Sequence, residues 1–330
     1  MTSTTSTTPT PTAAAPLHVI AGGGQIGPMV AARLLARGLR VRIVRRSAST
    51  EGAPDGAETV QADVRDAAQA ARAFAGADVV YHCANPRYHV WGTELAPLMR
   101  GIVDGAIAAG ARRLVVLGNL YVYEVPEDGR LAEDTRVAPV SKKGALRAAA
   151  DEIALAAGRR GDIEVAFGRA ADFVGPGVTQ ALFGERYWQK VAKGGAVETM
   201  GDVDMPHSYS FAPDVADALV TLGLTDRAVG GVWHLPTAAA EPTRAWIERF
   251  AAAFGVRPRW MTLPAWLCRV MGLFVPEAKE LPEMMYQWRH PYRLDSSRFC
   301  EAFGVTPTPI ERVVAETAAW ARATYGPVAA

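Results

Sequence analysis

A glycine-rich turn between an apolar strand and a helix constrains the fold of this chain more than any other stretch. The segment LHVIAGGGQIG spans residues 17–27, and the residues after it have the apolar spacing of a helix. It contains G-x-G-x-x-G: Gly22 permits a tight turn, Gly24 lets the backbone approach a pyrophosphate, and Gly27 lets the helix pack closely. The alternative is a turn that binds nothing. The predicted cofactor contacts in this turn are Gly22, Gly24, Gln25, Ile26 and Gly27.

Short apolar strands alternate with amphipathic helices through the first half of the chain. The predicted strands after the first are residues 41–46, 60–66, 77–84, 112–119 and 163–170. Helical spacing fills most of the intervals, for example residues 67–76 and 95–110. This alternation predicts an α/β fold, a Rossmann-type doubly wound parallel sheet.

The pattern changes after about residue 177, where short helices rich in Trp, Tyr, Met and Phe begin. We expect a dinucleotide-binding Rossmann domain at 17–177 and 205–235, and a smaller, mainly helical substrate-binding region at 178–204 and 236–330. For most of these aromatic residues, however, we expect plain core packing. Residues 1–16 are rich in Thr, Ser, Pro and Ala and lack a basic start and an apolar core, which predicts a disordered tail.

Composition excludes several classes of protein. Lys plus Arg number 35 against 34 Asp plus Glu, and this balance argues against a nucleic-acid partner. No run reaches the ~18 apolar residues of a membrane span, so no membrane partner is expected. The 3 cysteines form no CxxC pair and no Cys/His cluster, which predicts no metal site and a reduced, cytoplasmic protein.

Basic residues end the second predicted strand, where an NAD site usually has an acid for the ribose hydroxyls. Arg45 and Arg46 stand at this end, and arginine suits a 2′-phosphate by charge and by its forked geometry. Two exposed surface arginines are the alternative. In the third strand, Asp63 is placed to bind the adenine amino group and Val64 to contact the ring. We therefore expect NADP as cofactor, with NAD as the second choice.

Two cations lie one helical turn apart in the segment PVSKKGALRAAADE, residues 139–152. Lys143, Arg147 and Asp151 are spaced by four and share one face of the predicted helix. One interpretation is a solvated helix on which Arg147 pairs with Asp151. The other is a face turned toward something anionic or reactive.

Several segments resemble the extended short-chain dehydrogenase/reductase superfamily, in its NAD-dependent epimerase/dehydratase branch. The resemblance runs from about Leu17 to Trp320. The segments that carry it are GGGQIG, ADVRD, DVVYHCA, VVLGNLYVY, GRAADFVGPG, SYSFAPDVADAL and LDSSRFCEAFGVTPTP. The glycine motif is one residue shorter than the G-x-x-G-x-x-G common in that branch. The resemblance implies an NAD(P)-dependent enzyme with a Rossmann fold.

The resemblance also assigns catalytic positions, and none of them holds the usual residue. The branch carries Tyr-x-x-x-Lys at the start of the helix that follows strand five; here Lys143 falls on the tyrosine position and Arg147 on the lysine position. The helper Ser/Thr position falls on Asn119. Arg147 can still bind a ribose but cannot give up its proton. Lys143 is a candidate acid or carbonyl-polarising group, and Tyr121 and Tyr123 are candidate phenols.

The remaining expected contacts follow from the same resemblance. Further cofactor contacts are expected at Cys83, Ala84, Asn85, Arg147, Ala171 and Phe173. Substrate contacts are expected at Tyr88, His89, Trp91, His207 and Tyr209. A lone histidine such as His207 is more often a structural hydrogen bonder, and His82 is expected to be a packing residue near the cofactor.

Three functions remain open from the sequence. The first is an NAD(P)-dependent oxidoreductase that acts on a small organic carbonyl or hydroxyl substrate. The second is an epimerase, isomerase or lyase that uses bound NAD(P) without net redox change. The third is a non-catalytic NADP-binding sensor or partner-binding protein. A homodimer is compatible with all three.

Overall fold

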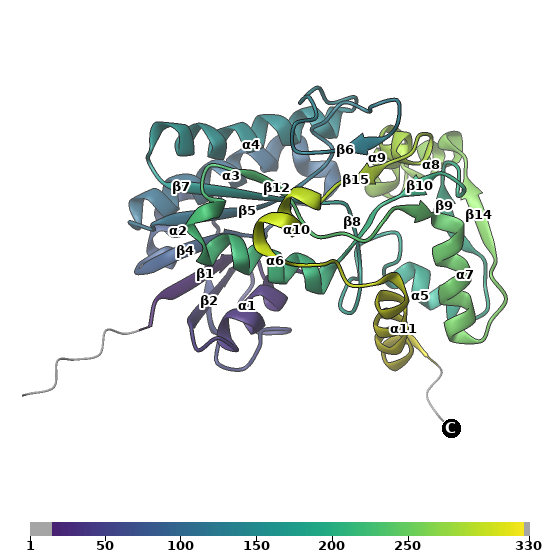
Figure 1. Ribbon diagram of the computed structural model, residues 1–330, viewed down its shortest axis with the longest axis horizontal. Helices are drawn as coiled ribbons and strands as arrows, with labels where there is room; N and C mark the ends of the chain where they lie inside the picture. The colour runs from purple at the N-terminus through teal and green to yellow at the C-terminus, as the bar shows by residue number, and fades with distance from the viewer. Residues whose placement is uncertain (1–14, 327–330) are drawn as a thin grey trace, which may run out of the picture.

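A seven-stranded parallel sheet lies at the centre of the computed structural model, which describes residues 15–326 (Figure 1). Its strand order is β12-β7-β5-β4-β1-β2-β3. The strands are β1 (Leu17–Ala21), β2 (Arg40–Arg45), β3 (Glu58–Gln61), β4 (Ala77–His82), β5 (Arg113–Asn119), β7 (Glu164–Ala170) and β12 (Val232–His234). The order reverses between β1 and β4, where ligands bind in such sheets. The predicted doubly wound fold is confirmed, whereas 1–14 of the predicted tail lie outside the described residues.

Helices cover both faces of the sheet. Figure 1 shows α4 above the sheet and α1 and α6 below it. The lower layer is α1 (Gly27–Leu35) and α6 (Ala212–Leu224), and the upper layer is α2 (Ala67–Phe74), α3 (Trp91–Ala108) and α4 (Lys142–Arg160). Each layer encloses its own apolar cluster against the sheet, so the central strands are buried on both sides.

Local side chains fix the ends of the helices that border the site. Asp66 accepts hydrogen bonds from the backbone N–H groups of Ala68 and Gln69 at 2.9 and 3.0 Å and so caps α2. Ser141 caps α4 by accepting from the N–H of Gly144 at 3.0 Å. Gly161 ends α4 with a φ of 77°, a conformation that glycine adopts without strain. These helix starts were predictable from local sequence.

The second region packs around an aromatic core. Its elements are α5 (Glu185–Val191), β9 (Val197–Met200), α7 (Thr243–Phe254), β14 (Trp260–Leu263), α8 (Ala265–Met271), α9 (Pro276–Met284), η3 (Met285–Trp288) and α11 (Ile310–Tyr325). The core rings include Phe183, Tyr187, Trp188, Trp246 and Phe250, and most pairs meet edge to face. Many of the aromatic residues in this region are therefore core residues, as expected.

Short ladders connect the second region to the sheet. They pair β8 (Asp172–Val174) with β11 (Tyr209–Phe211), β10 (Pro206–His207) with β13 (Glu241–Pro242), and β6 (Arg130–Leu131) with β15 (Arg293–Leu294). Two 3₁₀ turns, η1 (Tyr88–Val90) and η2 (Asp226–Ala228), complete the connections. One helix of the late segment, α10 (Ser297–Phe303), packs on the sheet: Phe299 and Phe303 contact Trp233 of β12 at ring separations of 6.1 and 5.0 Å. The predicted division placed this helix in the second region.

Candidate active site

The glycine turn after β1 has the geometry of a phosphate-binding turn. Gly22 has a φ of 118°, and a Cβ there would lie 2.5 Å from the backbone nitrogen of Ala84. A Cβ on Gly27 would lie 1.9 Å from the Gly22 carbonyl oxygen, so both glycines are required by packing. Gly24 differs, because a Cβ there would meet nothing within 4 Å. The start of α1 has no side-chain cap, which leaves its N–H groups for a ligand. The turn therefore fits a dinucleotide.

The other two residues of the turn have structural side chains. The Gln25 side-chain oxygen accepts from the backbone N–H groups of Thr179 and Gln180, both at 2.6 Å. It thereby ties the turn to the loop that follows β8. Ile26 is buried in the apolar cluster under the sheet. The predicted contacts of these two residues with a cofactor are consequently limited to their backbone atoms or need a rearrangement of Gln25.

Arg45 lies over the glycine turn. A Cβ on Gly23 would lie 2.4 Å from its Nη2 atom. Its Nη1 donates to the carbonyl oxygens of Ser49 and Glu51 at 3.0 and 2.9 Å, which fixes the guanidinium. Its Nε and Nη2 are buried and have no hydrogen-bond partner among the described residues. Two oriented donors beside a phosphate-type turn suit an anionic group.

Arg46 belongs to a separate network of charges. Its side chain is 64% exposed and lies 3.9 Å from Glu94, which also contacts Arg65 at 3.0 Å. Arg65 donates to the Asp63 carboxylate at 2.9 Å from Nε and 2.5 Å from Nη2, and this hydrogen bond lowers the pKa of Asp63. Val64 is buried beside it. Arg46 is therefore directed to α3, whereas Arg45 is directed to the turn.

Arg147 reaches the loop after β4. Its Nη2 donates to the Asn85 side-chain oxygen at 2.7 Å, and its guanidinium lies 4.8 Å from the centre of the Trp91 ring. Arg147 is 4% exposed, and burial lowers its pKa.

Burial also raises the pKa of the Cys83 thiol to about 12, so this cysteine is not a nucleophile.

Lys143 is neither solvated nor free to donate to a substrate. It is 2% exposed. Its Nζ pairs with Glu280 and with Glu283, the latter at 3.3 Å, and donates to the backbone carbonyl of Tyr88 at 3.2 Å. An ammonium has three donors, and all three have acceptors here. The solvated-helix interpretation is therefore wrong, and this arrangement gives the predicted acid or carbonyl-polarising role of Lys143 no available proton.

Asp151 completes the face of α4, with a different partner from the expected one. It pairs with Arg169 of β7 at 3.2 Å, and both side chains are buried. Burial raises the pKa of Asp151. His82, at the end of β4, is buried without a hydrogen-bond partner among the described residues, and burial with the nearby Arg147 charge lowers its pKa to about 3. His82 is thus the expected packing residue, and it is neutral.

Two tyrosines meet through their hydroxyl groups. The Tyr88 and Tyr121 oxygens are 2.7 Å apart, and the Asn119 side-chain oxygen accepts from the backbone N–H of Tyr121 at 3.1 Å. Burial raises the pKa of Tyr88 to about 12 and that of Tyr121 well above its usual value. Both phenols are therefore protonated donors at neutral pH. Tyr123 is not part of this group, because its hydroxyl contacts His234 Nε2 at 2.9 Å.

A histidine holds the carboxylate of Asp172, whose charge acts on both phenols. His207 Nε2 is 2.8 Å from the Asp172 carboxylate, and its Nδ1 is 3.2 Å from the Gln287 carbonyl oxygen. The ring stacks on Trp288 with centroids 4.6 Å apart. Both ring nitrogens therefore face acceptor oxygens, which fixes the orientation of the ring beside Asp172. Burial is the main cause, and the Asp172 charge a smaller cause, of the raised pKa of Tyr88, Tyr121, Tyr286 and Tyr292.

Sequence reasoning missed Asp172 although it named Ala171 and Phe173 on either side. In the structure, Ala171 is buried and Phe173 is half-buried against the sheet. The available signal was position: Asp172 lies two residues after the end of the buried parallel strand β7, at the carboxyl edge of the sheet where such folds bind ligands. An acid at that edge was a stronger candidate than its apolar neighbours.

Three predicted substrate contacts have structural partners instead. Tyr209 lies in the aromatic core, and its hydroxyl contacts the Thr243 hydroxyl at 2.8 Å. Trp91 is 1% exposed and packs beneath the cations of α4. His89 pairs with Glu277 of α9 at 3.1 Å. Core packing and docking of α9 thus account for these residues, whereas Tyr88 and His207 remain at the site.

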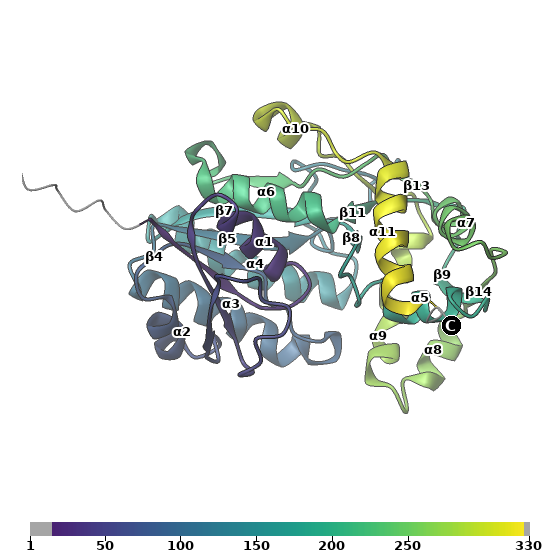
Figure 2. The same ribbon diagram turned by 90° about the horizontal axis from the view of Figure 1, so that it is seen from below.

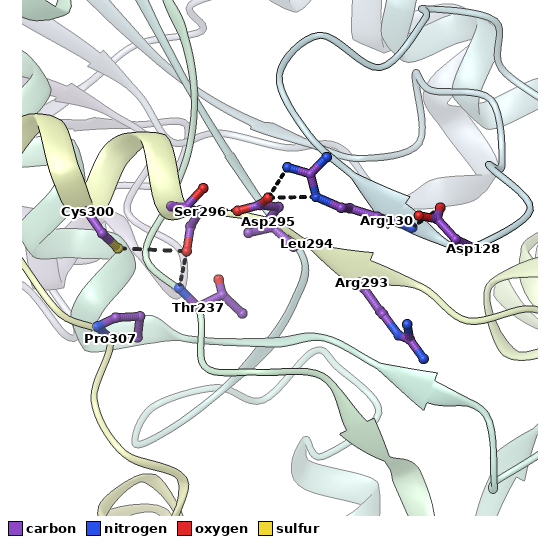
Figure 3. Close-up of a pocket in the computed structure, with 10 residues that line it drawn as sticks. Asp128, Arg130, Thr237, Arg293, Leu294, Asp295, Ser296, Cys300 and Pro307 are labelled. Atoms are coloured by element: carbon purple, nitrogen blue, oxygen red, sulfur yellow. Dashed lines mark hydrogen bonds and ion pairs between the residues drawn. The ribbon is translucent and has the colours of Figure 1, made fainter.

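A cavity of about 440 Å³ lies away from this group, near the end of β12 and beside α10 (Figure 3). An ion pair of Arg130 with Asp295 at 2.8 Å forms one wall, and Ser296 accepts from the Thr237 N–H at 3.2 Å. No predicted site residue lines it. Within residues 15–326, no group of three or more His, Cys, Asp and Glu side chains is placed to hold a metal ion.

Comparison with known proteins identifies the family. A sequence model of the NAD dependent epimerase/dehydratase family matches residues 18–232. The uncharacterized protein y4nG of Sinorhizobium fredii is 24% identical over 216 residues, a match that spans 61% of this chain and about half (52%) of that relative. The chain belongs to the NAD-dependent epimerase/dehydratase family and is an enzyme of that family.

Two further matches agree with this assignment. The dTDP-6-deoxy-L-talose 4-dehydrogenase (NAD(P)(+)) of Kitasatospora kifunensis is 28% identical over 268 residues, which are 77% of this chain and 84% of that protein. The UDP-glucose 4-epimerase of Thermus thermophilus, solved with NAD, superposes with a TM-score of 0.76 at 21% identity and covers 93% of this chain and 99% of its own. This last likeness concerns the fold.

Proposed function

We propose that the protein uses NADP(H) in preference to NAD(H). The observation that carries this proposal is the Arg45 guanidinium, which lies over the glycine turn with two donors that have no partner within residues 15–326. A forked guanidinium binds a 2′-phosphate through two parallel hydrogen bonds, and no acidic side chain follows at Arg46 to favour ribose hydroxyls. The relative named as using NAD(P)(+) supports either cofactor.

The proposed reaction is oxidation of a hydroxyl group, or reduction of a carbonyl group, on a small organic substrate. When bound, the nicotinamide supplies or accepts the hydride. Tyr88 and Tyr121 are protonated, and one of them donates a hydrogen bond to the substrate oxygen. Asp172 takes the hydroxyl proton during oxidation and returns it during reduction. His207 holds the Asp172 carboxylate in place as a positioning residue.

This assignment replaces the family's tyrosine with a carboxylate. Lys143 occupies the tyrosine position, and its donors are satisfied by α9 and by a backbone carbonyl. Asp172 is 21% exposed in its side chain and so can meet a substrate. The relative named as a sugar 4-dehydrogenase supports a redox reaction at a hydroxyl-bearing carbon.

A substrate panel tests the reaction. NADPH absorbance reports redox chemistry, and product analysis reports reactions without net cofactor change. We expect Asp172→Asn to lower kcat by ~10²–10³-fold with unchanged NADPH affinity, because a general base contributes an effect of this size. Tyr209→Phe is the control, since its hydroxyl lies in the core. Product without cofactor consumption would select an epimerase, isomerase or lyase, and tight NADPH binding without turnover would select a sensor.

Cofactor choice has its own test. Arg45→Ala should weaken NADPH binding by roughly 10–100-fold, because a charge-assisted hydrogen bond contributes about 1.5–3 kcal/mol. NADH binding should change much less, since it has no 2′-phosphate. Calorimetry with both cofactors measures the difference. Equal losses for the two cofactors would contradict the NADP assignment.

We also propose a cytoplasmic homodimer that joins through α3 and α4. The outer surfaces of these helices carry charges of both signs, Arg100 and Asp104 on α3 and Glu152 and Arg160 on α4, around a shallow cavity of about 260 Å³. A two-fold axis would bring opposite charges together. Sedimentation of the chain and of a Glu152→Lys variant tests this: the variant should shift to monomer.

A further inference from the structure

A helical hairpin of α8 and α9 projects from the second region. Figure 2 shows its turn at the lower edge of the molecule, away from the sheet. The turn side chains Leu273 and Phe274 are 78% and 85% exposed. No helix among residues 15–326 is long and apolar enough to cross a bilayer. Contact of a short hairpin with the surface of a bilayer needs no such helix.

The exposed large apolar side chains within residues 266–275 make up the apolar stripe of the hairpin. Trp266 and Val270 are 64% and 49% exposed, lie one turn apart on α8 and lead toward Phe274. Val275 continues the stripe at 48% exposure. Other exposed large apolar residues are scattered, which is normal for a surface. Apolar patches with such strongly exposed Phe and Leu side chains are typical of interaction sites.

The basic and acidic side chains of the hairpin differ in their surroundings. Arg269 and Lys279 flank the stripe, are exposed, and form no ion pair among the described residues. The acids of α9 are paired: Glu280 and Glu283 with Lys143, and Glu277 with His89 and with the exposed Arg87. The surface beside the apolar stripe is consequently cationic.

We propose that this hairpin docks on an anionic membrane surface, independently of the cofactor and the reaction. The stripe consists of side chains from residues 266–275 only, whereas each partner of a stable protein pair contributes about 20–30 residues. The stripe also lies on a projecting turn (Figure 2). Side chains on such a turn can insert into the interface of a lipid bilayer, whereas a flat protein surface would contact only a few of them. Tryptophan beside cations is typical of side chains at the headgroup level, where anionic lipids attract Lys and Arg. This proposal revises the expectation of no membrane partner.

Vesicle co-sedimentation of the full chain tests the proposal. The probe is vesicles of phosphatidylcholine and phosphatidylglycerol in about a two-to-one ratio, with pure phosphatidylcholine for comparison. We expect binding to the mixed vesicles that falls at least ~10-fold in a Leu273→Ser/Phe274→Ser variant, because these side chains enter the interface. Val137→Ser/Val140→Ser is the matched control, because these two residues are also exposed, at 57% and 55%, but lie outside the hairpin. Its binding should equal that of the parent chain.

A second pair of variants tests the electrostatic part. Arg269→Gln/Lys279→Gln should reduce binding to the mixed vesicles several-fold and leave binding to phosphatidylcholine unchanged. Circular dichroism confirms that each variant is folded. The proposal is overturned if the parent chain binds neither vesicle, or if the hairpin and control variants bind equally. A dimer that depends on Leu273 and Phe274 without vesicle binding would identify a second copy as the occupant.

Discussion

The two ends of the predicted cofactor cleft are built by different means. At the end near β1 and β2, the backbone itself forms the predicted site: packing requires glycine at positions 22 and 27, and Gly24 faces open space. At the end near β5 and α4, side chains form the predicted site: Lys143 and Arg147 lie buried on one face of α4, and Arg147 donates to Asn85. The comparison teaches that close backbone packing restricts the residues of the glycine turn to glycine. A side chain at the other end is restricted only by the partners that surround it.

The two ends also differ in the sequence distance of their contacts. The glycine turn is defined within eleven residues, 17–27, and its contacts to β2 and β4 repeat the sheet pairing. The Lys143 ammonium instead depends on Glu280, 137 residues away. One end is therefore readable from a local motif, and the other is determined by the tertiary fold.

The largest expected effect separates the glycines of the turn. Gly24→Val should leave the chain folded and weaken NADPH binding by about 10³-fold, or about 4 kcal/mol, because the side chain occupies the space for the phosphates. Gly27→Val is the contrasting variant and should fail to fold, because its Cβ would overlap the Gly22 carbonyl. Calorimetry and circular dichroism measure the two outcomes. Unchanged NADPH affinity in folded Gly24→Val would remove the dinucleotide assignment.

The next effect concerns Lys143. Lys143→Met leaves Glu280 and Glu283 without their cation and should lower the free energy of unfolding by about 2–3 kcal/mol, less than for a fully buried pair because both carboxylates are partly exposed. In the Lys143→Met background, Glu280→Gln should lower the free energy of unfolding by less than it does in the parent chain. Urea unfolding of the four proteins gives the coupling. Full stability with a kcat loss of ~10²–10⁴-fold would instead restore Lys143 as the general acid.

A smaller effect comes from His82, which borders Arg147. Its pKa is about 3 in the folded chain against 6.5 as its ordinary value. Below pH 6.5 the unfolded chain therefore takes up a proton that the folded chain refuses, so stability falls as pH falls toward 3. Protonation of His82 in the unfolded chain should lower the free energy of unfolding by about 2 kcal/mol between pH 7 and pH 5. His82→Phe should lose that part of the pH dependence in urea unfolding, whereas the exposed His290→Gln should retain it.

The smallest effect separates the two arginines after β2. Arg46→Ala should weaken NADPH binding by no more than about 0.5 kcal/mol, because its side chain is exposed and lies 3.9 Å from Glu94. Arg45→Ala is the comparison, with its larger expected loss. Titration of both variants with NADPH measures the ratio. Equal losses would show that Arg46 turns toward the cofactor when it binds.

Much of the fold, and one half of the site, were predictable from the sequence. Strand and helix periodicity, the Asp66 and Ser141 caps and the glycine turn are local signals, and the structure contains each of them. The position of α10 on β12 was not predictable, because an apolar face does not specify which surface it covers. The Asp172–His207 pair depends on β8 and β10 meeting across 35 residues. The phenols near Asn119 looked alike in sequence, and only folding separates Tyr121 from Tyr123.

The Lys143 pairing also limits how this chain could change over generations. A single Lys143→Tyr substitution would regain the family's tyrosine but would place a phenol against two carboxylates that no longer have a counter-ion. Regaining the family's pair therefore requires neutralising α9 first and exchanging Arg147 afterwards. Each intermediate along the opposite order carries a stability penalty. On the assignment of Lys143 to the family's tyrosine position, a contact from a distant helix thus makes a return to tyrosine dependent on the order of mutations.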